Sequence, residues 1–334
     1  MLKKTVFAGL GFFVPQNTVS NEDLTEKINT TDQWIRERSG IEERHHVVDG
    51  QETNLSMAAE ASRRAMKMAD ITAEEIDLIV FATLSPDFQF PGTGALLQHE
   101  LGCRTIGAID VRAQCSGFVY GLSIADQFIK TGMYQTVLLV GSEIQSNALD
   151  FSDHGRHIAV LFGDGAGAAV LKASDDPDRG ILSTHLHSQG EFARSLAILE
   201  PSYNKKDNIY PGLKEPGGPG YPVMEGQLVF KNAVKRFPEV IREALTANEL
   251  TLDDLDMLVP HQANLRISQF VQKKLKLRDE QIVNNIQKYG NTTAASIPIA
   301  LSEAVHDERI KQGDLVCLAT FGSGFTWSSA LIRW

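Results

Sequence analysis

The sequence predicts an α/β fold built from two duplicated halves, because two ungapped internal matches occur at one common offset. Residues 60–80, which read as a helix, an acidic turn and a strand, align with residues 239–259. The same offset places the apolar run 137–140 on residues 316–319, which adds a second pair of strands. Strands that alternate with amphipathic helices indicate βαβ-type sheets covered by helices. The acidic, turn-rich stretch 173–180 predicts a division into residues 1–175 and residues 176–334.

Length, charge and cysteine usage restrict the class of protein. The 334 residues are enough for two ordinary domains, and the hydrophobic fraction of 43% is typical of a globular protein. A formal net charge of −10 argues against nucleic acid as a partner. No apolar stretch has the length of a membrane span, so no membrane partner is expected. Three widely spaced cysteines do not suggest a disulfide framework, and we expect a cytoplasmic protein.

Cys115 is the candidate nucleophile. It lies in the segment RAQCSGF, between an expected strand at 105–111 and an expected helix at 117–129. The free N–H groups and the dipole of a helix N-terminus favour a thiolate, so this position predicts a lowered thiol pKa. The alternative for any single cysteine is an inert, buried thiol. We expect that alternative for Cys317, which lies inside the apolar run 315–319.

Two polar side chains of the second half lie beside expected strands and helices. His261, in PHQANLRI, follows the strand-like run 255–259, and Asn264 is expected to cap the next helix. Ligand sites of α/β sheets gather at such strand ends. Asn291, in YGNTTAASIP, is by itself most simply a turn residue. The three groups together carry the prediction, because a thiol, an imidazole and a carboxamide suit carbon–carbon bond chemistry on a thioester.

Long motifs extend this pattern over nearly the whole chain. Besides QCSGF, VPHQANLRI and YGNTTAASIP, they are TTDQWIRERSGIEERH around Trp34, GRHIAVLFGDGAGAAVL at 155–171 and FGSGFTWSSALIRW at 321–334. Together they resemble the β-ketoacyl-acyl-carrier-protein synthase III family of condensing enzymes. The resemblance implies a thiolase-like five-layered αβαβα fold and a homodimer. It also implies an acyltransferase that condenses an acyl-CoA primer with malonyl-acyl-carrier protein, with loss of carbon dioxide, to start fatty acid synthesis.

The resemblance implies a role for each site residue. Cys115 would accept the acyl group, and His261 and Asn291 would hydrogen-bond the malonyl thioester oxygen as carbon dioxide leaves. The backbone N–H groups of Cys115 and Ser323 would hold the other carbonyl oxygen. No metal and no cofactor are expected, since coenzyme A enters as the thioester substrate. The residues that would hold coenzyme A are Trp34, Arg38, Arg156 and Asn264.

The acyl primer is less well defined than the reaction. Phe90, in DFQFPG, would reach across the dimer and close the acyl pocket of the partner subunit, which predicts a short primer. Ser116 departs from the commoner form of the nucleophile motif. The Pro/Gly-dense segment 200–226 is expected to wrap over the surface near the site. These features keep an alternative function open: condensation of an unusual acyl or aryl thioester for a secondary metabolite or signal.

The acyl carrier protein is expected to dock on basic side chains near the site. Carrier proteins of this kind are strongly acidic, so an acidic enzyme needs a basic patch to receive one. Arg266 and Lys231 are the strongest candidates, although exposed helices commonly carry solvated lysines. The expected patch comprises Lys231, Lys235, Arg266, Lys273 and Lys274.

Other classes fit the sequence less well. A papain-like hydrolase would need the cysteine signature of that family, which is absent. A thiolase would need a second reactive cysteine near the C-terminus, where this chain has FGSGF. A non-catalytic acyl-binding scaffold does not explain why the thiol, the imidazole and the carboxamide all occur. The glycines of FGDGAGA at 162–168 do not have dinucleotide-binding spacing and are expected to serve tight packing.

Overall fold

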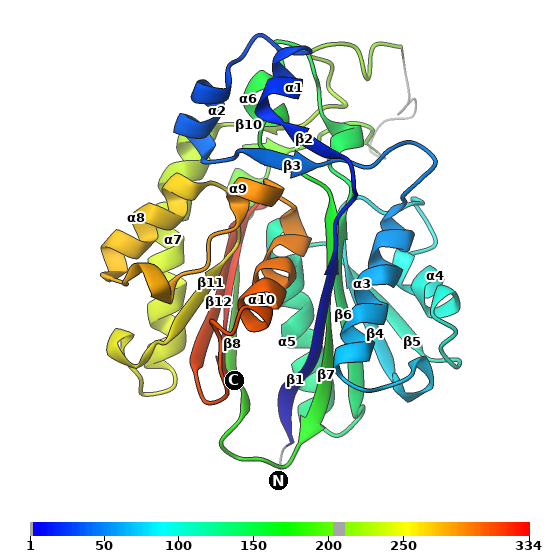
Figure 1. Ribbon diagram of the computed structural model, residues 1–334, viewed down its shortest axis with the longest axis vertical. Helices are drawn as coiled ribbons and strands as arrows, with labels where there is room; N and C mark the ends of the chain where they lie inside the picture. The colour runs from blue at the N-terminus through cyan, green and yellow to red at the C-terminus, as the bar shows by residue number, and fades with distance from the viewer. Residues whose placement is uncertain (1–2, 203–210) are drawn as a thin grey trace.

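Two mixed β-sheets dominate the computed structural model, which describes residues 3–202 and 211–334 (Figure 1). The strands of the first sheet, in spatial order, are β1 (Lys4–Phe13), β7 (Gly165–Ser174), β6 (Thr136–Glu143), β4 (Leu78–Ala82) and β5 (Gly107–Val111). β7 is antiparallel to both of its neighbours, β1 and β6, whereas β6, β4 and β5 are parallel. The second sheet comprises β8 (Gly180–Ser188), β13 (Thr326–Arg333), β12 (Leu315–Gly322) and β11 (Met257–Pro260).

The second sheet repeats the strand order and the strand directions of the first. β8, β13, β12 and β11 follow one another with the same two antiparallel pairs and one parallel pair as β1, β7, β6 and β4. The offset found in the sequence carries β6 onto β12 and β4 onto β11, so the predicted duplication is confirmed. A single parallel bridge between Leu258 and Ile282 takes the place of β5. The division at residues 175/176 lies between β7 and β8 and stays a prediction.

Helices complete five alternating layers, as Figure 1 shows from one side to the other. α5 (Gly117–Lys130) and α10 (Ser296–His306) lie between the two sheets and contact both. α3 (Asn54–Met68) and α4 (Thr93–Glu100) cover the outer face of the first sheet, and α7 (Gly226–Thr246) and α8 (Leu265–Leu275) cover that of the second. The predicted αβαβα fold is therefore confirmed.

Three apolar clusters hold these layers together. The central one packs α5 and α10 between the sheets, and the other two fill the spaces under α3 and under α7 and α8. The strands are apolar on both faces because each sheet is covered on both sides. Cys317 is completely buried in β12, as expected from its apolar run. A fully buried leucine such as Leu122 would cost ~2–5 kcal/mol if truncated to alanine.

The glycines of FGDGAGA allow close packing, as predicted. A Cβ on Gly163 would lie 2.2 Å from the carbonyl oxygen of Tyr289, and one on Gly167 would lie 2.7 Å from Cβ of Pro298 in α10. Only glycine permits these approaches. The segment that contains Asn291 is therefore pressed against the end of the first sheet.

Short elements form a cap over one end of the layers, at the top of Figure 1. Buried Arg44 holds this cap, since it donates to Asn21 Oδ1 and to the carbonyl oxygen of Val160, both at 2.8 Å. The elements are β2 (Thr18–Ser20), α1 (Asn21–Thr25), α2 (Asp32–Ser39), β3 (Glu43–His45), α6 (Arg156–Ala159), β9 (Leu196–Ala197), β10 (Val223–Met224) and α9 (Ile286–Tyr289).

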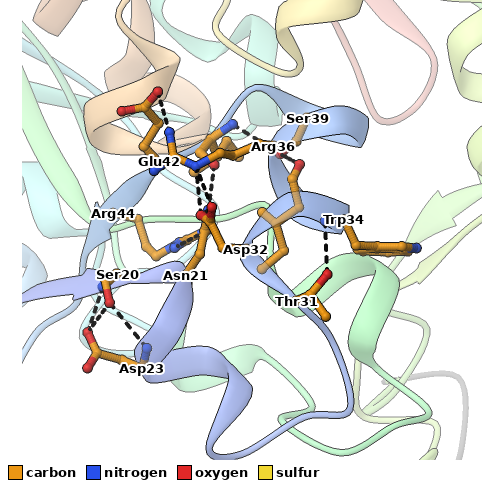
Figure 2. Close-up of polar contacts among 12 residues, drawn as sticks. Ser20, Asn21, Asp23, Thr31, Asp32, Trp34, Arg36, Ser39, Glu42 and Arg44 are labelled. Atoms are coloured by element: carbon orange, nitrogen blue, oxygen red, sulfur yellow. Dashed lines mark hydrogen bonds and ion pairs between the residues drawn. The ribbon is translucent and has the colours of Figure 1, made fainter.

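Helix α2 presents Trp34 from this cap. The hydroxyl of Thr31 caps the helix by accepting the N–H of Trp34 at 3.1 Å, and Asp32 pairs with Arg36 one turn on. In Figure 2, the indole ring of Trp34 points away from the Asp32–Arg36 pair.

Candidate active site

Cys115 lies in a strained turn at the start of α5. The turn η2 (Gln114–Ser116) begins with Gln114 at φ 42°, a left-handed conformation that few non-glycine residues adopt. The second half repeats this turn as η7 (Thr293–Ala295), which begins with Thr293 at φ 48° and leads into α10. Ala294 therefore occupies the position equivalent to Cys115. The duplicated turn carries a cysteine in one half only.

The strand β12 passes close to the cysteine. A Cβ on Gly322 would lie 2.5 Å from Cβ of Cys115 and 3.0 Å from its Sγ, so only glycine fits there. This approach brings the backbone N–H of Ser323 to the sulfur, where it and the N–H of Cys115 favour the thiolate. The two backbone donors named from the sequence thus both interact with the Cys115 sulfur.

The thiol pKa differs from the value expected at a helix N-terminus. Burial and the nearby charge of Glu143 raise the pKa of Cys115 to about 12, despite the two backbone donors. The prediction of a lowered pKa was therefore wrong for the unliganded site, because loss of hydration outweighs the donors. Near pH 7, the Cys115 side chain is therefore a neutral thiol.

His261 lies just beyond β11, where its backbone N–H donates to Ala319 of β12 at 2.8 Å. Its ring is buried, and burial lowers its pKa to about 3, so the imidazole is neutral near pH 7. Nδ1 lies 2.6 Å from Oγ of Ser296. Nε2 is also buried and has no hydrogen-bond partner among the described residues. The ring thus keeps one nitrogen for a substrate.

Asn291 forms an isolated parallel bridge with Phe162, and one hydrogen bond sets the orientation of its side-chain amide. Its Oδ1 accepts the backbone N–H of Thr293 at 2.9 Å, which leaves the Nδ2 group as a donor. Its own backbone pairs with that of Leu161 and Gly163. The side chain is 5% exposed, so the amide is nearly enclosed.

These three side chains line one cavity of about 580 Å³. Trp34, Arg38 and Asn264 line it as well. Asn264 caps α8 by accepting the N–H of Arg266, as predicted, and its Nδ2 donates to the carbonyl oxygen of Arg38 at 2.9 Å. The cavity therefore runs from the buried thiol to the cap that carries Trp34.

Two guanidinium groups lie over the Trp34 ring. Cζ of Arg38 is 4.9 Å and Cζ of Arg156 is 5.2 Å from its centroid. Arg156 also donates to the carbonyl oxygen of Asn29 at 2.9 Å. An aromatic face beside two cations suits a planar, anionic ligand.

The remaining predicted residues lie on the surface. Phe90 is 83% exposed and does not line the cavity of its own chain. Arg266 lines the cavity and is exposed, with its guanidinium 5.8 Å from the ring of Phe230 in α7. The basic side chains exposed on α7 and α8 include Lys231, Lys235, Lys273 and Lys274. From the segment 200–226, Met224 and Gly226 line the cavity, while residues 203–210 lie outside the described part.

Two residues of the site had no role in the sequence-based prediction. Glu143, at the end of β6, is fully buried and accepts hydrogen bonds from Leu84 N–H and from Ser85 Oγ, the latter at 2.6 Å. Ser296 begins α10 and contacts His261. The repeat offers the signal for Ser296, because the offset of the halves aligns it with Gly117 of the nucleophile motif.

The described residues contain neither a cluster of metal-ligating side chains nor a helix long and apolar enough to cross a membrane. Papain-like architecture is also excluded by the two duplicated mixed sheets.

A duplicated αβαβα fold with a cysteine turn at the junction of its halves defines a thiolase-like condensing enzyme. Residues 109–190 match the family model of 3-oxoacyl-[acyl-carrier-protein] synthase III, and residues 245–334 match that of its C-terminal part. The β-ketoacyl-[acyl-carrier-protein] synthase III of Rhodospirillum centenum is 47% identical over 99% of both chains. That of Xanthomonas campestris is 48% identical over 98% of this chain and 97% of its own.

Solved structures agree with these relatives. The 3-oxoacyl-[acyl-carrier-protein] synthase III of Aquifex aeolicus has a TM-score of 0.90 and 40% identity, over 99% of this chain and all of its own. The chain belongs to the β-ketoacyl-acyl-carrier-protein synthase III family.

Proposed function

We propose that the protein condenses an acyl-CoA primer with malonyl-acyl-carrier protein and releases carbon dioxide, coenzyme A and 3-oxoacyl-acyl-carrier protein, the first elongation of fatty acid synthesis. The observation that carries the proposal is the convergence of Cys115, His261 and Asn291 on one cavity. The specialised-pathway alternative is not favoured, because relatives near 47% identity over the full chain are named synthase III.

Cys115 performs the first half of the reaction. Its sulfur attacks the thioester carbonyl carbon of acyl-CoA, and the bond from that carbon to the coenzyme A sulfur breaks. The proton of the thiol passes to the departing coenzyme A thiolate, so no net charge is produced. The N–H groups of Cys115 and Ser323 stabilise the oxyanion that forms in between, because both face the reacting sulfur.

His261 and Asn291 serve the second half. The bond between the malonyl α-carbon and its carboxylate breaks, and the electron pair moves onto the thioester oxygen as an enolate. Nε2–H of His261 and Nδ2–H of Asn291 donate to that oxygen. The α-carbon then attacks acyl-Cys115, and the cysteine sulfur leaves and takes a proton from solvent. Neutral donors suit this step, because burial holds the pKa of His261 at about 3.

Coenzyme A binds at the cap. Its adenine stacks on Trp34, and its phosphates pair with Arg38 and Arg156, whose guanidinium groups lie over that ring. Asn264 lines the channel for the pantetheine arm. In this proposal, coenzyme A is part of the thioester substrate, and the reaction uses neither a resident cofactor nor a metal.

The protein acts as a cytoplasmic homodimer in this proposal. β5 is the edge strand of the first sheet and is largely exposed, which suits pairing with a second copy. Phe90 then enters the partner's acyl pocket and favours short primers, since it is 83% exposed in its own chain.

A reducing compartment keeps Cys115 as a thiol. The basic residues of α7 and α8 receive the carrier protein.

Intact-protein mass spectrometry and carbon dioxide release test the function. After incubation with acetyl-CoA, wild type gains one acetyl group, and Cys115→Ala gains none and does not condense. His261→Ala and Asn291→Ala still acylate but lose decarboxylation of malonyl-acyl-carrier protein. Cys317→Ala, which removes a buried thiol of β12, is the matched control and keeps both steps. An adduct on the Cys115→Ala protein would contradict the assignment.

A further inference from the structure

The first residue of α10 contacts Nδ1 of His261, whose other ring nitrogen has no hydrogen-bond partner among the described residues. Oγ of Ser296 lies 2.6 Å from Nδ1, and both side chains are buried, each 2% exposed. The backbone N–H of Gln262 donates to the same Oγ at 3.5 Å. Nδ1 of the imidazole therefore contacts a single side-chain hydroxyl, that of Ser296.

The duplication shows that this contact is specific to the second half. The offset between the halves aligns Ser296 with Gly117 and His261 with Ala82. In the first half, a Cβ on Gly117 would lie 3.1 Å from Cβ of Ala82 and 3.3 Å from Cβ of Ala294, so a side chain would be crowded. In the second half, the equivalent position holds Ser296, and its side chain contacts His261.

The hydrogen-bond pattern favours one position for the imidazole proton. The Ser296 oxygen already accepts from the Gln262 N–H, and its O–H has no other acceptor among the described residues. A hydroxyl has one proton to give, and a neutral imidazole has one accepting nitrogen. We propose that Ser296 is a positioning residue that donates to Nδ1 of His261 and thereby fixes the tautomer with its proton on Nε2.

This proposal rests on the proposed function and deepens it. An imidazole that stays neutral has a single N–H, so only one tautomer can donate to the thioester oxygen. Nε2 is buried without a partner among the described residues, and His261 lines the cavity. In the opposite tautomer, a lone pair on Nε2 would face the developing negative charge. Ser296 therefore acts on the decarboxylation and not on the acylation of Cys115.

The tautomer is measurable without any substrate. In the full-length protein labelled with ¹⁵N-histidine, the His261 ring signals are identified by their loss in His261→Gln. We expect a protonated Nε2 and an unprotonated, hydrogen-bonded Nδ1 in wild type, and a mixture of tautomers in Ser296→Ala. A proton on Nδ1 in wild type, or the same spectrum in Ser296→Ala, would overturn the proposal.

Partial reactions provide the second measurement. We expect Ser296→Ala to lower kcat for malonyl-acyl-carrier protein decarboxylation about 10- to 100-fold, with little change in KM and none in Cys115 acylation. Ser296→Thr keeps the hydroxyl and should restore most of the rate. Ser329→Ala is the control, because it removes a buried hydroxyl that donates to Val240 away from the cavity.

The outcomes separate this proposal from the function itself. Equal losses in acylation and decarboxylation, or no loss, would refute the role of Ser296. A wild-type protein that releases no carbon dioxide from malonyl-acyl-carrier protein would refute the proposed function, while the ring signals would still report the tautomer.

Discussion

The carboxyl group of Glu143 lies near the thiol of Cys115 and disfavours its ionisation. Its negative charge adds to burial and raises the pKa of the thiol to about 12. Glu143 is itself enclosed by Leu84, Ser85 and Thr83, and burial raises its pKa to about 7. The resting site thus contains two groups whose charged forms disfavour each other.

Replacement of Glu143 by glutamine should make Cys115 more reactive in the free enzyme. Above pH 7 the carboxyl is ionised, so its removal stabilises the thiolate and lowers the thiol pKa. We expect alkylation by iodoacetamide at pH 8 to become several-fold faster, with the pH–rate profile displaced to lower pH. Glu60→Gln, on the outer helix α3, serves as the control. An unchanged or slower rate would show that the charge does not reach the sulfur.

The same substitution should change the pH dependence of stability. The pKa of Glu143 is raised from 4.5 unfolded to about 7 folded, so folding favours its protonated form. That contribution is fully present below about pH 4.5 and is lost as the pH rises through about 7. Between pH 5 and pH 8, wild type should therefore lose on the order of 1–3 kcal/mol more unfolding free energy than Glu143→Gln. Urea unfolding at both pH values measures this difference, and parallel curves would contradict it.

Arg266 should govern the encounter with the acidic carrier protein. Arg266→Glu is expected to raise KM for malonyl-acyl-carrier protein, more strongly at low salt where screening is weak. Acylation of Cys115 by acyl-CoA should remain nearly unchanged. Lys67→Glu, an equal charge reversal at an exposed residue of α3, is the control. A defect that ignores ionic strength, or that includes acylation, would make Arg266 a structural residue of the cavity wall.

Phe90 should limit the length of the acyl primer. If its ring closes the acyl pocket of the partner subunit, Phe90→Ala enlarges that pocket and extends primer use toward longer chains. Competition among acyl-CoAs of increasing length, read by mass spectrometry of acyl-Cys115, measures the profile. Phe88→Ala is the matched control, because Phe88 is an exposed neighbour on the same loop. An unchanged profile would assign specificity to the segment 200–226 instead.

The sequence by itself predicted the duplicated α/β architecture, and it named Cys115, His261 and Asn291, which line one cavity in the structure. Local patterns carry this information. The repeat aligns β4 with β11 and β6 with β12, and Asn264 could be recognised as a helix cap. The cysteine turn could be placed because an apolar strand and a helix flank it. Residue identities also fixed which side chains could serve as nucleophile and donors.

Only the tertiary structure decided the electrostatics of the site. The pKa of Cys115 depends on burial and on Glu143, which lies on another strand, so the neighbouring helix terminus alone gave the wrong direction. The contact at Nδ1 of His261 is made by Ser296 of α10, which lies 35 residues further along the chain. The approach of Ser323 to the sulfur required Gly322 in β12. Hydration and hydrogen bonding are set by groups brought together from both halves, and chain order does not encode those distances directly.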